Sequence, residues 1–380
     1  MDVLIFHAST GNGHMSAALA LEEEFRARGY EVACHDVLDY TPPGFCAWYR
    51  GGYEFLVKQK PDIWGDIYEK ADEEGFAYSF QTSLDHRFCK GIDHLILEGK
   101  PKWVLVTHSL PLPRLSLLRR RHRFFKIGTV ITDLYPHKMW LRGRPDHFFV
   151  MSDWSKEQLG LRSHGAEART TVTGIPIAAC FSEEISQSEA RRRTDLDEDL
   201  PVALLTAGGI GAGPMMPLLS AMARSMIPVQ AVVVCGRNEQ ARANLESRAR
   251  ELERRSKTKI RVLGQVSQQG MADLMNACDV LIGKSGGLTT SEAMATGCPF
   301  LVADPFLIPG QEEGNADFMV QAGIGARAAT PEEAAEHLVF LLKSPDRLDQ
   351  MRSQALSHAH PKAAASIADK VLSMSDIKQP

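Results

Sequence analysis

Short apolar runs alternate with amphipathic segments along most of the chain. The first run, at 2–6, precedes a segment at 16–28 whose apolar positions recur at helical spacing. Continuous apolar runs are typical of strands buried in a parallel sheet, and their alternation with helices indicates βαβ units. Further runs predict strands at 31–37, 103–110, 126–134, 147–152, 170–176, 201–209, 229–236, 259–266, 278–283 and 300–304. The pattern therefore predicts an α/β fold.

A polar, highly charged stretch at 180–201 interrupts this alternation, which then begins again. Such a stretch suits a linker between domains. We therefore predict two Rossmann-like domains, covering 1–178 and 179–361. We also expect a last helix, at about 362–376, to pack back onto the first domain.

Aromatic residues are concentrated at 39–80, where the strand–helix alternation is absent. Two short amphipathic helices are predicted there, around 45–58 and 62–72. Aromatic side chains such as Trp48, Tyr53 and Trp64 suit a groove that binds an apolar acceptor molecule, or a contact with the membrane interface. The alternative is that these side chains only pack against the sheet.

A second candidate membrane contact is the basic segment at 114–126, which contains Arg119, Arg120, Arg121 and Arg123 among leucines and phenylalanines. Clustered arginines beside apolar residues attract anionic lipid headgroups. We interpret this segment as a basic, membrane-facing helix, with a solvated helix face as the alternative.

Residues 278–317 contain the densest group of candidate binding residues. A strand of buried type is followed by the glycine loop at 283–287 and a helix predicted over 288–296. Glycines between a strand and a helix let backbone amides approach an anion, and the helix N-terminus adds unpaired N–H groups and a positive dipole end. The P-loop pattern is not present here. We therefore predict a diphosphate cradle of another type.

The same unit offers receptors for a ribose and a sugar. Glu292 lies within the predicted helix, where its carboxylate can accept two ribose hydroxyls. The strand at 300–304 then opens into a loop with Gln311, Glu312 and Asn315, which can hydrogen-bond sugar hydroxyls. Each half alone is compatible with an ordinary turn and a solvated loop. Together, at this spacing, they favour a sugar-nucleotide site.

The first predicted strand ends in a turn that contains Gly11, Gly13 and His14. Open α/β sheets bind ligands at the carboxyl ends of their strands, where this turn lies. Because a helix N-terminus lowers the pKa of a histidine, we predict that His14 is neutral near pH 7 and can act as a base. A histidine that only caps its helix is the alternative. The turn matches the dinucleotide fingerprint only in part, so we predict no dinucleotide site.

The composition of the chain limits which kinds of partner and which cell compartment we predict. Hydrophobic residues make up 44% of the chain, and its net charge of −4 gives no general attraction for nucleic acid. Apolar runs stay below the ~18 residues that a spanning helix needs. The cysteines are odd in number and lack a C-x-x-C motif, which is typical of reduced thiols. We predict a cytoplasmic protein, peripheral on the inner face of the cell membrane.

Taken in order, several motifs resemble the monogalactosyldiacylglycerol synthase and processive diacylglycerol glycosyltransferase group. This group belongs to the larger family of the lipid II-forming N-acetylglucosaminyltransferase of peptidoglycan synthesis. The matching motifs are the G-x-G-H turn at 11–14, TDLYPHKMW at 132–140, VTGIPI at 172–177, the glycine loop at 207–213, CGRN at 235–238, KSGGLTTSE at 284–292 and DPFLIPGQEEGNAD at 304–317.

The resemblance implies a GT-B architecture, in which two Rossmann-like domains face each other across a cleft. It implies an acceptor lipid, diacylglycerol first, on the N-terminal domain and a UDP-hexose donor on the C-terminal domain. The implied transfer inverts the anomeric centre and uses no bound metal or other cofactor. No D-x-D motif follows a predicted strand, since the D-x-D at 195–197 lies in the charged linker.

The resemblance also implies roles for individual residues. His14 takes the proton of the acceptor hydroxyl, and Asp133 and His137 orient that hydroxyl or share the role. Gly11, Gly13 and Trp140 belong to the acceptor side. The implied donor residues are Gly209, Gly286, Gly287 and Thr289 for the diphosphate, Glu292 for the ribose, Gln265 and Val266 for the uracil, and Gln311, Glu312 and Asn315 for the hexose. Gly208, Lys284, Ser285 and Leu288 are implied as further donor-binding residues.

The chain departs from the group's pattern at three places, namely Gln265, Ser285 and the longer loop at 307–308. These departures leave the identity of the sugar open. Two other functions are compatible with the same features. One is an isomerase like the UDP-N-acetylglucosamine 2-epimerases, and the other is a glycosyltransferase that uses another lipid or a small-molecule acceptor.

Overall fold

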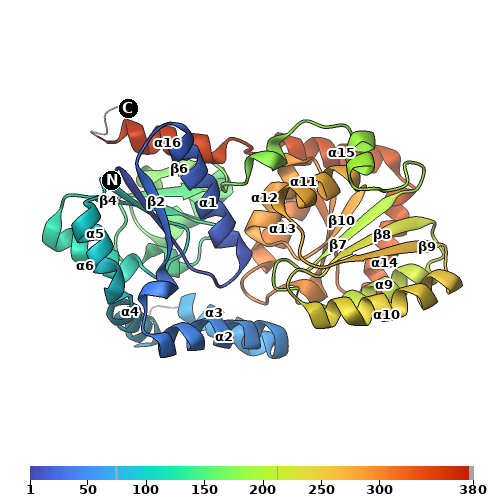
Figure 1. Ribbon diagram of the computed structural model, residues 1–380, viewed down its shortest axis with the longest axis horizontal. Helices are drawn as coiled ribbons and strands as arrows, with labels where there is room; N and C mark the ends of the chain where they lie inside the picture. The colour runs from blue at the N-terminus through green and yellow to red at the C-terminus, as the bar shows by residue number, and fades with distance from the viewer. Residues whose placement is uncertain (73–75, 212, 376–380) are drawn as a thin grey trace. The chain divides into compact units, whose positions relative to one another are not determined.

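The computed structural model describes residues 1–72, 76–211 and 213–375 of the chain. The chain forms two compact units (Figure 1). Unit 1 consists of Met1–Ala178 and the C-terminal segment His360–Pro380, and unit 2 is Ala179–Ala359. Each unit contains one six-stranded sheet in which all pairs of strands are parallel. The predicted α/β fold with two Rossmann-like sheets is confirmed.

The sheet of unit 1 has the strand order β2-β1-β3-β4-β5-β6. Its strands are β1 Val3–His7, β2 Val32–Asp36, β3 Trp103–Val106, β4 Lys126–Val130, β5 His147–Val150 and β6 Thr170–Val172. Its helices are α1 Asn12–Ala27, α2 Pro43–Gln59, α3 Pro61–Asp72, α4 Phe76–Phe88, α5 Asp93–Gly99, α6 Leu112–His122, α7 Asp153–Arg162 and α16 Ala363–Ser373, with short 3-10 helices that include η3 Lys138–Leu141.

The sheet of unit 2 has the strand order β12-β11-β10-β7-β8-β9. Its strands are β7 Val202–Thr206, β8 Val229–Val234, β9 Thr258–Leu263, β10 Val280–Gly283, β11 Phe300–Ala303 and β12 Gly325–Ala328. Its helices are α8 Gln187–Arg193, α9 Met215–Arg224, α10 Glu239–Arg255, α11 Gln268–Ala277, α12 Gly287–Ala295, α13 Glu313–Gln321, α14 Pro331–Leu342 and α15 Pro345–Ser357, with the 3-10 helices η5 Ala179–Ser182 and η6 Asp304–Phe306.

The strand order reverses at one point in each sheet, because β1 lies between β2 and β3 and β7 lies between β8 and β10. The helices that follow the two strands at such a point pack on opposite faces. In unit 1, Leu115 of α6 joins the core on the side of Leu4, whereas Leu21 of α1 packs on the side of Ile5. The carboxyl edge of a sheet at such a reversal point is where open α/β folds bind ligands.

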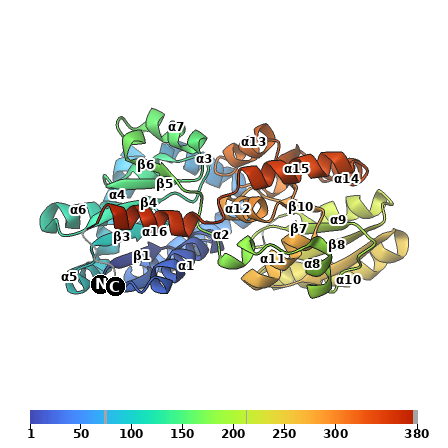
Figure 2. The same cartoon turned by 90° about the horizontal axis from the view of Figure 1, so that it is seen from above.

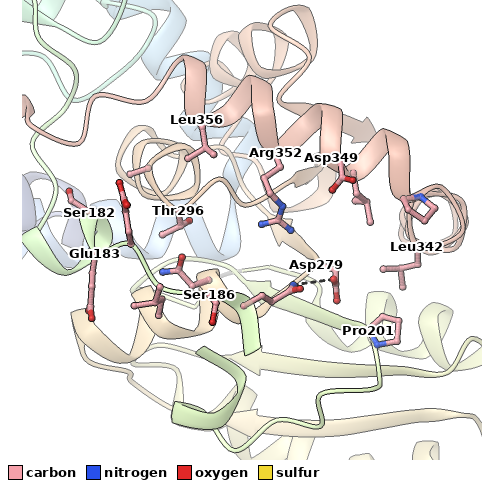
Figure 3. A pocket seen from close by; sticks show the side chains of 17 residues that line it. Ser182, Glu183, Ser186, Pro201, Asp279, Thr296, Leu342, Asp349, Arg352 and Leu356 are labelled. Carbon is pink, nitrogen blue, oxygen red and sulfur yellow. Dashed lines mark hydrogen bonds between the residues drawn. The ribbon is translucent and has the colours of Figure 1, made fainter. Parts of the chain in front are cut away.

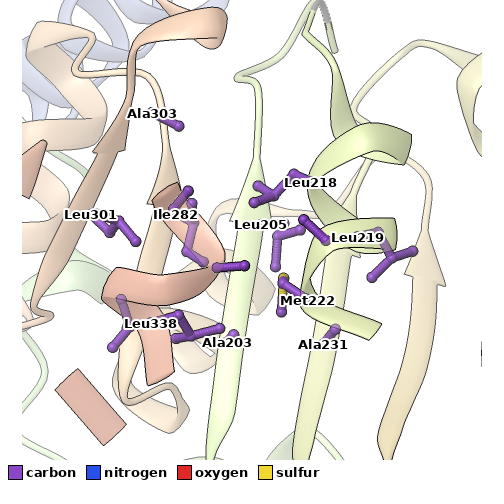
Figure 4. Close-up of a cluster of buried hydrophobic side chains, with 14 of the residues drawn as sticks. Ala203, Leu205, Leu218, Leu219, Met222, Ala231, Ile282, Leu301, Ala303 and Leu338 are labelled. Atoms are coloured by element: carbon purple, nitrogen blue, oxygen red, sulfur yellow. The ribbon is translucent and has the colours of Figure 1, made fainter. Parts of the chain in front are cut away.

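The core of unit 2 explains how its strands are held together beneath that edge. Buried side chains of α9, such as Leu218 and Met222, pack against Leu205 of β7 and Ile282 of β10 (Figure 4). At the end of β10 a Cβ on Gly283 would lie 2.2 Å from the carbonyl oxygen of Thr206 in β7. Only glycine permits this close approach of the two strands.

Most predicted element types are confirmed, with shifted boundaries. The aromatic segment forms α2 and α3 as predicted, and its last residues begin the further helix α4, which the pattern did not predict. The basic helix predicted over 114–126 ends at His122, because Arg123 has a left-handed backbone with φ of 50° and Lys126 already begins β4. The strand predicted over 300–304 ends at Ala303, since Pro305 has no N–H for a sheet hydrogen bond and the chain turns into η6. Residue 376, at the end of the predicted last helix, lies outside the described residues.

None of the helices in the described part of the chain has the length and hydrophobicity that a membrane span requires.

The C-terminal helix α16 belongs to unit 1 and packs against α1 (Figure 2). Its side chains Ile367 and Val371 are fully buried in the core cluster that contains Leu21 and Phe25 of α1. This helix therefore closes one face of the first sheet with residues that are distant in sequence.

We expect Ile367→Ala to lower the free energy of unfolding of the protein by about 2–5 kcal/mol, because the change leaves a cavity in a packed core. Denaturation by urea, followed by circular dichroism, measures the difference. Ser366→Ala, at the exposed neighbouring position, is the matched control and should change stability by less than about 0.5 kcal/mol. Equal stability of the two variants would contradict the packing of α16.

Candidate active site

His14 lies in the first turn of α1, at the point where the strand order of unit 1 reverses. Its Nδ1 is 2.7 Å from the carbonyl oxygen of Thr107, the residue that follows β3, and 2.9 Å from Oγ1 of Thr132. A carbonyl oxygen only accepts hydrogen bonds, so Nδ1 carries the proton. The hydroxyl of Thr107 in turn donates to the carbonyl oxygen of His14 at 2.8 Å. These contacts fix the ring and leave the lone pair on Nε2.

Burial lowers the pKa of His14 to about 4, the nearby His7 adds to this effect, and the hydrogen bond to Thr107 opposes it. The imidazole is therefore neutral near pH 7, in the direction predicted from the sequence, although the main cause is burial and not the helix end. Two aromatic rings flank it, with centroid distances of 4.6 Å to His108 and 6.2 Å to Trp140. A neutral imidazole with one free ring nitrogen is suited to accept a proton.

The two other predicted catalytic residues are placed differently. Asp133 follows β4 and accepts a hydrogen bond from the indole of Trp140 at 3.0 Å. His137 is almost completely buried, and both of its ring nitrogens are engaged, since Nδ1 accepts from the amide of Met139 and Nε2 donates to the carbonyl oxygen of Tyr68. His137 thus joins η3 to α3, and its role toward the acceptor hydroxyl stays a prediction.

The predicted acceptor and membrane residues fall into two groups. Gly11 and Gly13 lie at the start of α1, where no side chain caps the helix. Trp140 is only 3% exposed and lies beside His14, and its place on the acceptor side stays a prediction.

The second group, which is exposed or half-buried, lies on α2 and α3 and at the end of α6. The side chain of Trp48 is 67% exposed, whereas the rings of Tyr53 and Trp64 contact each other with a centroid distance of 5.1 Å. Arg119 forms an ion pair with Asp146. The other predicted basic residues of this segment are Arg120 and Arg121, in the last turn of α6, and Arg123, which caps it.

In unit 2 the glycine turns after β7 and β10 meet at the second reversal of strand order. Gly208 has a φ of 71°, and a Cβ on it would lie 3.2 Å from Cε of Lys284. The next helix, α12, begins at Gly287 without a side-chain cap. Its first backbone N–H groups are therefore available to an anion, as the sequence predicts. Gly209 belongs to the glycine turn that follows β7. Leu288 and Thr289 lie in the first turn of the helix α12.

Glu292 lies in the second turn of α12 and is 8% exposed. Burial raises the pKa of its carboxyl to about 8. The group is therefore largely protonated at neutral pH in this arrangement. A ligand that donates hydroxyl hydrogen bonds to it favours the ionised form and lowers this pKa.

The loop after η6 is fastened to the glycine turn by three contacts. Nζ of Lys284 is 2.5 Å from Oε1 of Glu312, Oγ of Ser285 donates to the backbone oxygen of Glu312 at 3.0 Å, and Nδ2 of Asn315 donates to the backbone oxygen of Ser285 at 2.7 Å. The predicted sugar-binding residues Glu312 and Asn315 are thus buried and hold the two loops together. Gln311 lies beside them at the turn.

The remaining donor candidates, Gln265 and Val266, follow β9, the edge strand of the same sheet. Gln265 is exposed. They lie at the carboxyl edge of the sheet, as do the glycine turns.

A cavity of about 790 Å³ opens elsewhere in unit 2 (Figure 3). Pro201 and Asp279, which line it, precede β7 and β10, so the cavity lies at the amino ends of these strands. Thr296, just after the C-terminus of α12, lines it as well. The cavity and the glycine turns thus lie at opposite ends of α12.

The residues that orient His14 are not among the predicted site residues. Thr107 and Thr132 both follow apolar strands that are far from His14 in sequence, and His108 is adjacent to Thr107. Polar residues directly after buried strands are the signal that marks them, because the ends of parallel strands share one edge.

Two family models match the chain. The model described as "Monogalactosyldiacylglycerol (MGDG) synthase" matches residues 14–177, and "Glycosyl transferases group 1" matches residues 216–358. The first match falls in unit 1 and begins at His14, and the second falls in unit 2.

Individual relatives extend these matches over the whole chain. A probable monogalactosyldiacylglycerol synthase of Glycine max is 30% identical over 96% of this chain and 70% of its own length. A processive diacylglycerol beta-glucosyltransferase of Bacillus pumilus is 27% identical over 99% of this chain and 95% of its own. Among solved structures, MurG of Acinetobacter baumannii superimposes with a TM-score of 0.61, at 14% identity, over 98% of this chain and 99% of its own. The fold is the predicted GT-B fold.

The buried carboxyl of Glu292 generates a prediction about stability and pH. Its pKa in the folded protein, about 8, is above the ordinary value of 4.5. The folded state therefore favours the protonated form, and stability is lost as pH rises from about 5 to 8. We expect Glu292→Gln to remove this loss, so that the variant gains up to about 5 kcal/mol over the wild type at pH 8 and little at pH 5.

Urea denaturation of both proteins between pH 5 and 9, without ligand, measures this difference. Glu336→Gln, at an exposed position of α14, is the matched control and should follow the wild type. A pH dependence that Glu292→Gln leaves unaltered would show that the carboxyl is ionised in the folded protein.

Proposed function

The chain belongs to the monogalactosyldiacylglycerol synthase family of glycosyltransferases, and from this membership we propose that it transfers a hexose from a UDP-sugar to diacylglycerol with inversion at the anomeric carbon. The names of the relatives support diacylglycerol as the acceptor. The observation that carries the proposal is that each sheet has a structure suited to one part of the transfer at the point where its strand order reverses. Unit 1 has a neutral, oriented imidazole there, and unit 2 has an uncapped helix between glycine turns.

In this proposal unit 2 binds the donor. The backbone N–H groups at the start of α12, together with Gly208 and Gly209, receive the diphosphate, and Glu292 accepts the ribose hydroxyls. The edge residues Gln265 and Val266 meet the uracil. The loop that contains Gln311, Glu312 and Asn315 faces the hexose.

Unit 1 activates the acceptor. Nε2 of His14 takes the proton of the acceptor hydroxyl. The oxygen of that hydroxyl forms a bond to C1 of the hexose, and the bond between C1 and the UDP oxygen breaks. The contacts of His14 with Thr107 and Thr132 keep Nε2 unprotonated and oriented. Negative charge that develops on the leaving UDP is stabilised by the backbone amides and the positive end of α12. Asp133 and Trp140 form the adjacent wall.

Exposed apolar side chains on α2 and α3 support a peripheral contact with the membrane that holds the lipid acceptor. Trp48, Phe55, Ile63 and Ile67 are 67%, 58%, 49% and 47% exposed. Arginines at the end of α6 add positive charge that suits anionic lipid. We propose that these surfaces place the protein on the inner face of the cell membrane.

The transfer is tested by incubating the protein with a UDP-hexose and vesicles that contain diacylglycerol. We expect UDP to be released only when diacylglycerol is present, and the glycolipid to have the anomeric configuration opposite to that of the donor. Mass spectrometry and the anomeric proton coupling in NMR spectra identify the product. An epimeric UDP-sugar formed without release of UDP would instead establish an isomerase.

His14→Ala is the control for the mechanism in the same assay. Loss of the base should reduce turnover by at least about 100-fold and leave the affinity for UDP unchanged, because His14 and the donor residues lie on different units. Substantial residual turnover would transfer the role of the base to Asp133.

The membrane contact is tested by flotation with vesicles of neutral and anionic lipid. An aromatic side chain that enters the interface contributes about 1.5–3 kcal/mol, so the double variant Trp48→Ser, Phe55→Ser should bind at least about tenfold more weakly. Leu161→Ser on α7 removes an apolar side chain that is 76% exposed and is the matched control. Equal losses in both variants would contradict a contact through α2.

A further inference from the structure

The ion pair between Lys284 and Glu312 occupies the centre of the proposed diphosphate site. The side chain of Lys284 is 21% exposed and that of Glu312 is 4% exposed, so the pair is largely shielded from water. Lys284 belongs to the turn after β10, and Glu312 belongs to the loop before α13. The pair therefore joins the turn proposed for the diphosphate to the loop proposed for the hexose.

The glycines around this pair show how closely it approaches the helix end. A Cβ on Gly286, the residue that precedes α12, would lie 3.3 Å from Oε1 of Glu312 and 3.9 Å from Nζ of Lys284. A Cβ on Gly208 would lie 3.2 Å from Cε of Lys284. The side chain of Lys284 thus lies close to both glycine turns, beside the start of α12 where the diphosphate is proposed to bind.

The carboxylate of Glu312 has its hydrogen bonds supplied from within the fold. Oε1 binds Lys284, and Oε2 accepts from the backbone N–H of Ile308 at 3.0 Å. A sugar hydroxyl that approaches Oε1 therefore competes with the ammonium of Lys284 for this oxygen. The contact of Ile308 does not depend on Lys284, so Oε2 stays anchored if the ammonium moves.

We propose that the Lys284–Glu312 pair is an exchangeable counter-ion that makes the site prefer UDP-hexose to UDP. This inference rests on the proposed function. When the donor binds, Lys284 leaves Glu312 for the diphosphate, and a hydroxyl of the hexose replaces it at Oε1. After transfer the hexose is gone, Glu312 regains Lys284, and UDP loses a cationic partner.

The preference for UDP-hexose over UDP follows because a buried carboxylate needs a partner for its charge. A buried carboxylate that loses its counter-ion without a replacement is strongly destabilised. UDP alone takes Lys284 and leaves Oε1 without a partner, whereas UDP-hexose supplies both the phosphate and the hydroxyl. The intact pair thus weakens the binding of the product and not that of the donor.

The test is calorimetry with UDP, UDP-hexose and uridine on four proteins, namely the wild type, Glu312→Gln, Lys284→Met and the double variant. We expect Glu312→Gln to bind UDP about tenfold more tightly, because Lys284 is then free for the phosphates. The glutamine still offers an oxygen to the N–H of Ile308. We expect Lys284→Met to bind UDP about tenfold more weakly, and uridine, which lacks phosphates, to bind all four proteins equally.

The double variant isolates the interaction of the two residues. If the gain in Glu312→Gln comes from releasing Lys284, it disappears in the Lys284→Met background. Glu313→Gln removes the same charge at the exposed neighbouring position and is the matched control. Its affinity for UDP should stay within about twofold of the wild type.

An unchanged or weaker affinity of Glu312→Gln for UDP would overturn the exchange, as would a gain that persists without Lys284. Unfolding curves of the four proteins exclude loss of structure as the cause, and the single variant Lys284→Met keeps the proposal testable if Glu312→Gln does not fold. A wild-type protein that binds neither UDP nor UDP-hexose would instead refute the proposed donor site itself. The two failures are therefore distinct.

Discussion

The parallel pairing of β10 with β7 brings the glycine turns that follow these strands to one edge of the sheet. Close contact at Gly283 and the core under β7 hold the pair in register. The pairing of β1 with β3 does the same in unit 1, where it places Thr107 beside His14. The candidate site of each unit depends on this one constraint, because open α/β sheets bind ligands where the strand order reverses.

Burial then sets the protonation states of His14 in unit 1 and Glu292 in unit 2. Removal from water disfavours the charged form of any group, so it lowers the pKa of His14 and raises that of Glu292. A neutral imidazole can take a proton in the proposed transfer. In the proposed function, the protonated carboxyl of Glu292 ionises when ribose hydroxyls donate to it, so binding of the ribose releases a proton. Two opposite shifts in pKa thus have a single physical cause.

The glycine turns of unit 2 and the loop after η6 are joined to one another by several contacts. Ser285 and Asn315 fasten the loop to the turn through backbone oxygens, and the Lys284–Glu312 pair joins their charges. In the proposed function this connection lets the diphosphate and the hexose be recognised together. The exposed aromatic residues of α2 are, by contrast, a separate surface on unit 1, suited to the lipid side of the reaction.

Local pattern was sufficient for much of this protein. Apolar runs, glycine turns and the break at 180–201 predicted two parallel sheets, and the residue types around 284–292 predicted the uncapped helix with Glu292 inside it. Pattern could not place long-range partners. Only the folded chain decided that both ring nitrogens of His137 are engaged, that Trp140 is a buried wall, and that Glu312 is paired with Lys284. Such contacts depend on where the ends of distant strands lie in space, and the spacing of residues along the sequence does not determine these positions.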